Sequence, residues 1–120
     1  MHDLDGVLGP AVTQFVEHHV RALLAWDILV FFDRNQDAAL DASGLAASLG
    51  RRAEEVEPEI ARLCDARILE CEDDIVRFRP TPELREGIGA FVDACQDRER
   101  RLALIALVLH RIGRNPADIF

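Results

Sequence analysis

The stretch "LGRRAEEVEPEIARLCDARILE", residues 49–70, decides the fold of this chain. Val56, Ile60 and Leu63 recur at the spacing that brings side chains to one face of an α-helix, and this pattern predicts a helix buried along that face. The opposite face then presents four residues to solvent: Glu54, Pro58, Ala61 and Asp65. The flanks carry three charged residues: Glu55, Glu57 and Arg62. A helix with this buried face therefore exposes mostly carboxylates.

The segments on either side predict two further elements. Asp41 is a good N-cap for a short helix over "ASGLAASL", residues 42–49, and Gly50 supplies its C-terminal stop. Pro58 is expected near the first turn of the second helix, where a missing N–H is tolerated. After this helix, "RILEC" and "DIVRF" flank "EDD", which predicts a short β-hairpin.

Helical segments flank this central region. Pro10 suits a first helical position, and the helical pattern runs over residues 10–33 as one helix or more. Thr81 and Pro82 are expected as N-cap and first residue of C-terminal helices over residues 81–113. The first of these helices has five residues in its expected buried stripe: Leu84, Ile88, Phe91, Val92 and Cys95.

Composition limits the class of protein. With 120 residues and 49% of them hydrophobic, the chain predicts one domain, residues 1–120, that is largely helical. The net charge of −8 repels nucleic acid and anionic membranes at long range. Three cysteines without CxxC spacing, and an acidic N-terminus, indicate a reduced, cytoplasmic protein without a signal peptide. The longest apolar runs are too short for a membrane span, so no membrane association is expected.

The order of elements is a long helix, a short strand, two helices joined by a tight turn, a hairpin and C-terminal helices. It resembles the winged helix-turn-helix domain of small bacterial MarR-like regulators. The residues that carry the resemblance are Leu45, Ala46, Leu49 and Gly50 in the first motif helix and turn, Val56, Ile60 and Leu63 in the second, and Ile68 and Leu69 at the wing. The resemblance implies a mostly α fold in which residues 40–80 form the helix-turn-helix and a small β-hairpin wing, with N- and C-terminal helical extensions.

The resemblance also implies a DNA-binding transcription regulator that acts as a dimer on double-stranded DNA. In such proteins the second motif helix enters the major groove and the wing touches the backbone. Arg51 and Arg52 stand at the entrance of this helix, and strand alternation puts Arg77 and Arg79 on one face of the wing. Together with Arg62, these arginines are the expected contacts with phosphates or base edges.

The charge of the same region favours a different function. Residues 51–80 hold six Arg and nine acids, a net charge of −3, whereas DNA affinity depends on neutralising phosphates with basic side chains. The arginines could simply pair with neighbouring carboxylates on the surface. The alternative is therefore a winged-helix interaction module that meets a basic partner protein through Glu54, Glu57 and Asp65. The two functions rank nearly level, with transcription regulation slightly ahead because of the resemblance.

The flanking helices contain more apolar residues than one core-facing stripe needs, and this excess predicts a homodimer. In "LALIALVL", Leu102, Ile105 and Leu109 suffice for one core-facing stripe, so other apolar residues are left over. The expected dimer contacts are Leu24, Trp26, Phe31, Leu104, Leu107 and Val108. The alternative is that the N- and C-terminal helices of one subunit cover each other.

Nothing in the sequence predicts catalysis, a metal site or a cofactor. His18 and His19 lack a ligand partner at metal spacing, so a surface or interface role is the better interpretation. His110 is placed to interact with a helix dipole. Cys64 and Cys95 have core-like neighbours, whereas Cys71 is flanked by Glu70 and Glu72, which disfavours a reactive thiolate. No phosphate-binding glycine loop or nucleophile motif is present.

Overall fold

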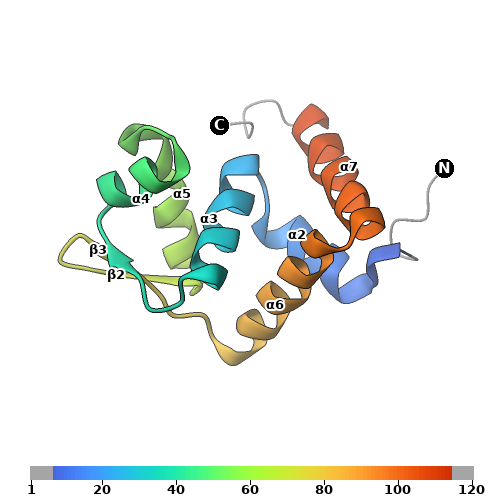
Figure 1. Ribbon diagram of the computed structural model, residues 1–120, viewed down its shortest axis with the longest axis horizontal. Helices are drawn as coiled ribbons and strands as arrows, with labels where there is room; N and C mark the ends of the chain where they lie inside the picture. The colour runs from blue at the N-terminus through green and yellow to red at the C-terminus, as the bar shows by residue number, and fades with distance from the viewer. Residues whose placement is uncertain (1–6, 115–120) are drawn as a thin grey trace.

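The computed structural model describes residues 7–114, and it is mostly helical with a small three-stranded antiparallel sheet (Figure 1). The elements follow in the order α2 (Pro10–His19), α3 (Leu23–Arg34), β1 (Ala39–Leu40), α4 (Ala42–Leu49), α5 (Ala53–Asp65), β2 (Leu69–Glu72), β3 (Ile75–Phe78), α6 (Pro82–Gln96) and α7 (Arg98–Arg114). No described helix combines the length and the apolar character that crossing a bilayer requires.

The pair α4 and α5 forms as its sequence predicts, except that Pro58, which was expected near the first turn, is the sixth residue of α5 and lies inside the helix. The Asp41 side chain accepts a hydrogen bond of 2.7 Å from the Gly44 backbone N–H, which caps α4. Gly50 ends the helix with a φ of 68°, a left-handed conformation that glycine adopts without steric cost. In α5, Val56 and Leu63 are fully buried and Ile60 is 5% exposed, so the predicted inward face is confirmed.

The predicted hairpin is present, and a third strand extends it. Strands β2 and β3 pair from Leu69↔Phe78 to Glu72↔Ile75. Asp73 and Asp74, with φ of 52° and 65°, make the two-residue turn that such a tight hairpin requires. The short β1 pairs with the other edge of β3, through Ala39↔Arg77 and Leu40↔Val76, which makes β3 the central strand. The wing is thus part of a three-stranded sheet.

Helix α3 lies centrally in the molecule, between the α4–α5 pair and the α6–α7 pair (Figure 1). The apolar run of the N-terminal region is divided into α2 and α3 by a break at residues 20–22. Five residues of α3 are buried: Leu24, Ala25, Ile28, Leu29 and Phe32. The Phe32 ring stacks on Phe78 of β3 at 5.9 Å, which links α3 to the sheet. This central position explains why the helix is apolar on nearly every side.

The predicted inward face of α7 is wrong. Leu102 is 60% exposed and Leu109 is 49% exposed, whereas Leu104 and Val108 are fully buried. Helix α7 packs on α6 and α2, and the buried pair lies one turn apart. Because nearly every residue from 102 to 109 is apolar, the sequence pattern carries little information about which face turns inward.

Substitutions in α7 test this orientation. We expect Leu104→Ala to lower the free energy of unfolding by about 2–4 kcal/mol, because it leaves a cavity in the core. The matched Leu102→Ala variant removes the same atoms from a mostly exposed side chain, and should cost less than about 1 kcal/mol. Urea unfolding measures both values. A larger loss from Leu102→Ala would mean that α7 is rotated.

Candidate functional site

The outward face of α5 carries exposed carboxylates, as its sequence predicts. Glu54, Glu57 and Asp65 are all exposed, and so are Pro58 and Ala61 between them. This orientation follows directly from the burial of the opposite face. Among the described residues, no basic side chain pairs with these three carboxylates.

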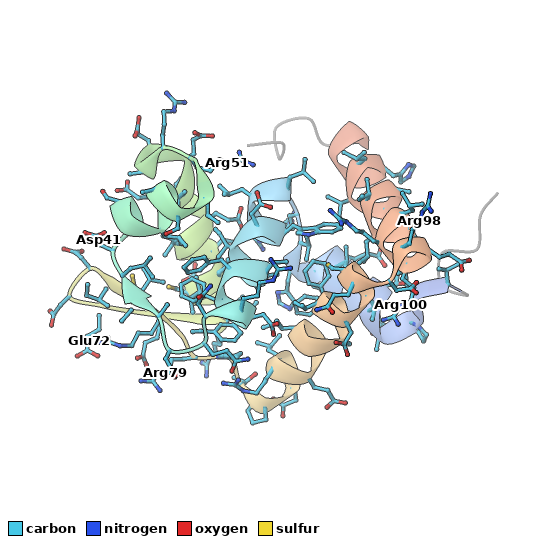
Figure 2. The ribbon with its side chains drawn as sticks, viewed as in Figure 1. Asp41, Arg51, Glu72, Arg79, Arg98 and Arg100 are labelled. Carbon is cyan, nitrogen blue, oxygen red and sulfur yellow. The ribbon has the colours of Figure 1, made fainter. Side chains whose placement is uncertain are left out.

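A groove runs between this face of α5, the start of α4 and the β2–β3 hairpin. Its volume is about 640 Å³. We name it the acidic groove because four carboxylates line it: Asp41, Glu57, Asp65 and Asp74. Its apolar lining includes Ile60, Ala61 and Val76. Asp41 and, on the hairpin, Glu72 lie at one end of the molecule, whereas Arg98 and Arg100 lie at the other (Figure 2).

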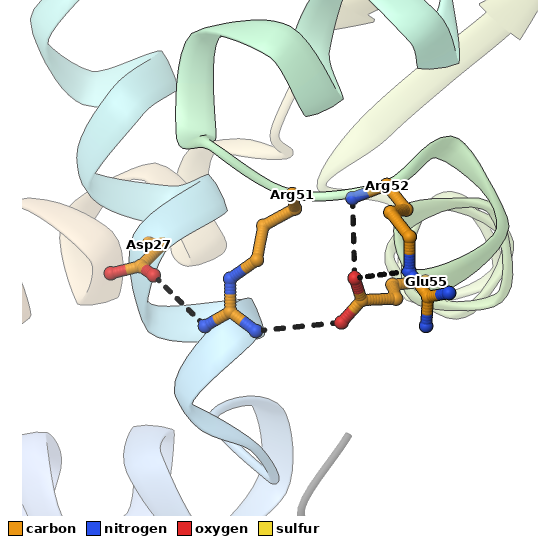
Figure 3. A network of polar contacts seen from close by, with 4 residues as sticks. All are labelled: Asp27, Arg51, Arg52 and Glu55. Carbon is orange, nitrogen blue, oxygen red and sulfur yellow. Dashed lines mark hydrogen bonds and ion pairs between the residues drawn. The ribbon is translucent and has the colours of Figure 1, made fainter.

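Arg51 and Arg52, at the entrance of α5, are engaged within the chain (Figure 3). Arg51 lies 3.5 Å from the Asp27 carboxylate of α3 and 3.7 Å from Glu55, and its side chain is only 24% exposed. Arg52 is 75% exposed, and its Nε donates to Glu55 at 3.2 Å. The Arg52 backbone N–H and side chain, which both donate to Glu55, lower the pKa of that carboxyl, and so do the charges of both arginines. Glu55 therefore neutralises much of this arginine pair.

Arg62 is a structural residue that connects α5 to the end of α2. Its guanidinium donates to the His19 carbonyl oxygen at 2.6 Å and, through Nε, to Glu59 at 2.6 Å. The His19 ring is half-buried, and burial lowers its pKa, with further lowering by the Arg62 and His18 charges. Arg62 was predicted as a DNA contact, but both its contacts lie within the chain, and only 27% of its side chain is exposed.

The two arginines of the wing are more accessible. Val76 and Phe78 are buried, so strand alternation turns Arg77 to the other face of β3. Arg77 is half-buried opposite Glu70 of β2. Arg79 follows β3, is 63% exposed, and lies 3.7 Å from the Glu70 carboxylate. Glu70 thus faces both cations of the wing.

The structure does not bring the five predicted arginines into one free basic surface. Arg51 and Arg62 are held inside the chain, and Arg52 and Arg79 each have a carboxylate partner. Sequence reasoning missed the part that Asp41 and Asp74 play in the acidic groove, because they come from segments distant from α5 along the chain. Their only sequence signal is their position at the helix cap and at the hairpin turn.

The six predicted dimer contacts fall into two groups. Leu24, Leu104 and Val108 are buried within the single chain, which corrects the inference that they are surplus. Trp26, Phe31 and Leu107 are partly buried against the core, with the Trp26 ring 5.3 Å from Phe91 in an edge-on contact.

Cys64 and Cys95 lack the properties of catalytic nucleophiles. Burial raises the pKa of Cys64 to about 11, with a further contribution from the neighbouring Cys71 thiol. Burial also raises the pKa of Cys95 to about 11. Thiols with such pKa values stay protonated near neutral pH, and the thiolate is the reactive form. Within the described part of the chain, no cluster of three or more His, Cys, Asp or Glu side chains could hold a metal ion.

Comparison with known proteins adds no further assignment. No protein-family model, curated protein or solved structure matches this chain. The residues themselves must therefore support any functional proposal.

The structural role of Arg62 can be tested by measuring the free energy of unfolding. We expect Arg62→Gln to lower the free energy of unfolding by about 1–3 kcal/mol, because the His19 carbonyl and Glu59 lose a charged hydrogen-bond donor. The control Arg79→Gln should change it by less than about 0.5 kcal/mol, since its ion pair is exposed. Equal effects in urea unfolding would contradict the structural role of Arg62.

The lowered pKa of His19 predicts a pH-dependent stability. Below its ordinary pKa of 6.5, His19 binds a proton more readily in the unfolded chain than in the folded one. Its contribution to stability is therefore complete above this pKa and decreases as the pH falls toward the lowered folded-state value. Between about pH 7.5 and about pH 5.5, the free energy of unfolding should fall more in the unmodified protein than in His19→Gln. An identical fall in both proteins would contradict the lowered pKa.

Proposed function

We propose that this chain is a winged-helix interaction module whose acidic groove binds a basic partner protein. The order α3, β1, α4, α5, β2 and β3 is compatible with a winged helix and supports this fold assignment. In this proposal the chain is not an enzyme and acts in the cytoplasm, where it forms a homodimer. Leu24, Leu104 and Val108 take no part in the dimer contact, because they are buried within one chain. Fold alone does not assign function, so the proposal rests on the chemistry of the surface.

The observation that carries the proposal is the exposed set of carboxylates on α5, with which no cation within residues 7–114 pairs. Glu54, Glu57 and Asp65 would face the phosphates if α5 entered a major groove. A basic protein surface instead complements them, since opposite charges steer association and select the partner. The apolar lining beside Glu57 and Asp65 can accept the methylene stem of a lysine or arginine, whose charge then meets the surrounding carboxylates.

Transcription regulation through DNA is the second candidate, and one observation favours it. Arg52 and Arg79 are 75% and 63% exposed, at the helix entrance and at the wing, where winged-helix proteins meet phosphate. Arg79 can leave its exposed partner Glu70 at low cost, because such pairs contribute little, whereas Glu55, the partner of Arg52, is only 22% exposed. Two cations of this kind beside an acidic helix provide fewer phosphate contacts than specific DNA binding normally uses.

A charge-neutralising variant tests the first proposal. We expect the triple variant Glu54→Gln, Glu57→Gln, Asp65→Asn to bind a short oligolysine peptide about tenfold more weakly than the unmodified protein, because three attractive contacts are lost. The control is a triple variant on α2 and α6, Glu17→Gln, Glu83→Gln, Asp93→Asn, whose residues are also exposed. Both variants remove three of the acidic charges, so an equal loss in the two would show only an effect of net charge and contradict the proposal.

A gel-shift assay separates the second candidate. At low salt, where phosphate contacts are strongest, we expect no retardation of genomic DNA fragments by the unmodified protein. Retardation that is lost in the double variant Arg77→Ala, Arg79→Ala would instead support a DNA-binding regulator and overturn the interaction module.

A further inference from the structure

A second groove lies away from the acidic groove, where α3 meets the end of α4, the end of α6 and the start of α7. Its volume is about 500 Å³, within the range of small-molecule sites. We name it the inter-helix groove. Five of its twelve lining residues are apolar: Trp26, Val30, Phe31, Leu49 and Val92. All of them are at least partly buried against the core, so the groove has an apolar part beside its polar residues.

Two arginines line the same groove from opposite elements. Arg34 stands in the last turn of α3, and Arg101 lies in the first turn of α7. Among the described residues, no carboxylate lies within ion-pairing distance of either guanidinium. Asp27 also lines the groove, but its carboxylate is 3.5 Å from Arg51. The two arginines therefore offer positive charge that no carboxylate among residues 7–114 neutralises by an ion pair.

Cys95 lines the same groove as the two arginines, and its pKa is affected by both of them. Burial raises the pKa of this thiol to about 11, while the positive charges of Arg101 and Arg34 each act to lower it. Cys95 is itself part of the groove lining.

We propose that the inter-helix groove binds a small organic anion, with its apolar body against Trp26 and Phe31 and its anionic group between Arg34 and Arg101. Guanidinium groups match the geometry of carboxylate and phosphate oxygens, so either anionic group fits. Aromatic side chains provide a flat apolar surface for the body of the ligand. A chain with a net charge of −8 has no general attraction for anions, so binding depends on these two local cations.

Trp26 provides the measurement, because it is the only tryptophan of the chain. Its indole N–H gives one resonance in a ¹H–¹⁵N spectrum, which can be followed during titration with benzoate, phenyl phosphate, benzamide and inorganic phosphate. We expect benzoate or phenyl phosphate to shift this resonance to saturation, and the better of the two identifies the preferred anionic group. Neutral benzamide should bind at least about tenfold more weakly than the better anion, because it makes no charge-assisted hydrogen bonds.

Variants of the two cations complete the test. Arg34→Gln and Arg101→Gln should each weaken binding of the better anion about tenfold or more. The control Arg21→Gln removes the same charge from an exposed position between α2 and α3 that is not part of the groove lining, and should leave the affinity within about twofold. Equal weakening in all three variants, binding of inorganic phosphate as tight as that of phenyl phosphate, or no shift with any probe would overturn the proposal. Since this groove is separate from the acidic groove, each outcome is independent of oligolysine binding.

Discussion

The burial of one face of α5 determines what its other face presents to a partner. Val56, Ile60 and Leu63 are removed from water together, and each such side chain contributes on the order of 2 kcal/mol to folding. A rotation of the helix would expose all three and bury carboxylates, which is far more costly than any gain at the surface. Glu54 and Asp65 therefore face solvent as a consequence of packing. The chemistry of the candidate surface follows from this one orientation.

Two arginines at α5 hold the helix in this orientation through contacts within the chain. Arg51 connects the start of α5 to α3, and Arg62 connects its last turn to the end of α2. Positive charge is thus used to hold the helix in place, while negative charge remains free around the acidic groove. In the inter-helix groove the charge is of the other sign: Arg34 and Arg101 line this groove together with apolar side chains. The two grooves have opposite polarity, and their proposed ligands differ accordingly.

The elements that could be predicted from the sequence are those whose residues show a strong local pattern. Helix α5 has a clear helical period, α4 has a cap at Asp41 and a stop at Gly50, and the hairpin is marked by adjacent turn-forming residues. The orientation of α7 was not predictable, because in an almost uniformly apolar run no polar residue marks the face that turns to solvent. The role of Arg62 was not predictable either. Its acceptor is a backbone carbonyl that is 43 positions away, and no side-chain pattern marks that contact.

Solvent accessibility along α5 in solution tests the central claim most directly. A soluble paramagnetic probe broadens the methyl resonances of side chains that it can approach. The methyl groups of Val56, Ile60 and Leu63 should be protected, whereas that of Ala61 on the outward face should be strongly broadened. Equal broadening of Ile60 and Ala61 would show that the helix is rotated or detached, and would contradict the account of the acidic surface.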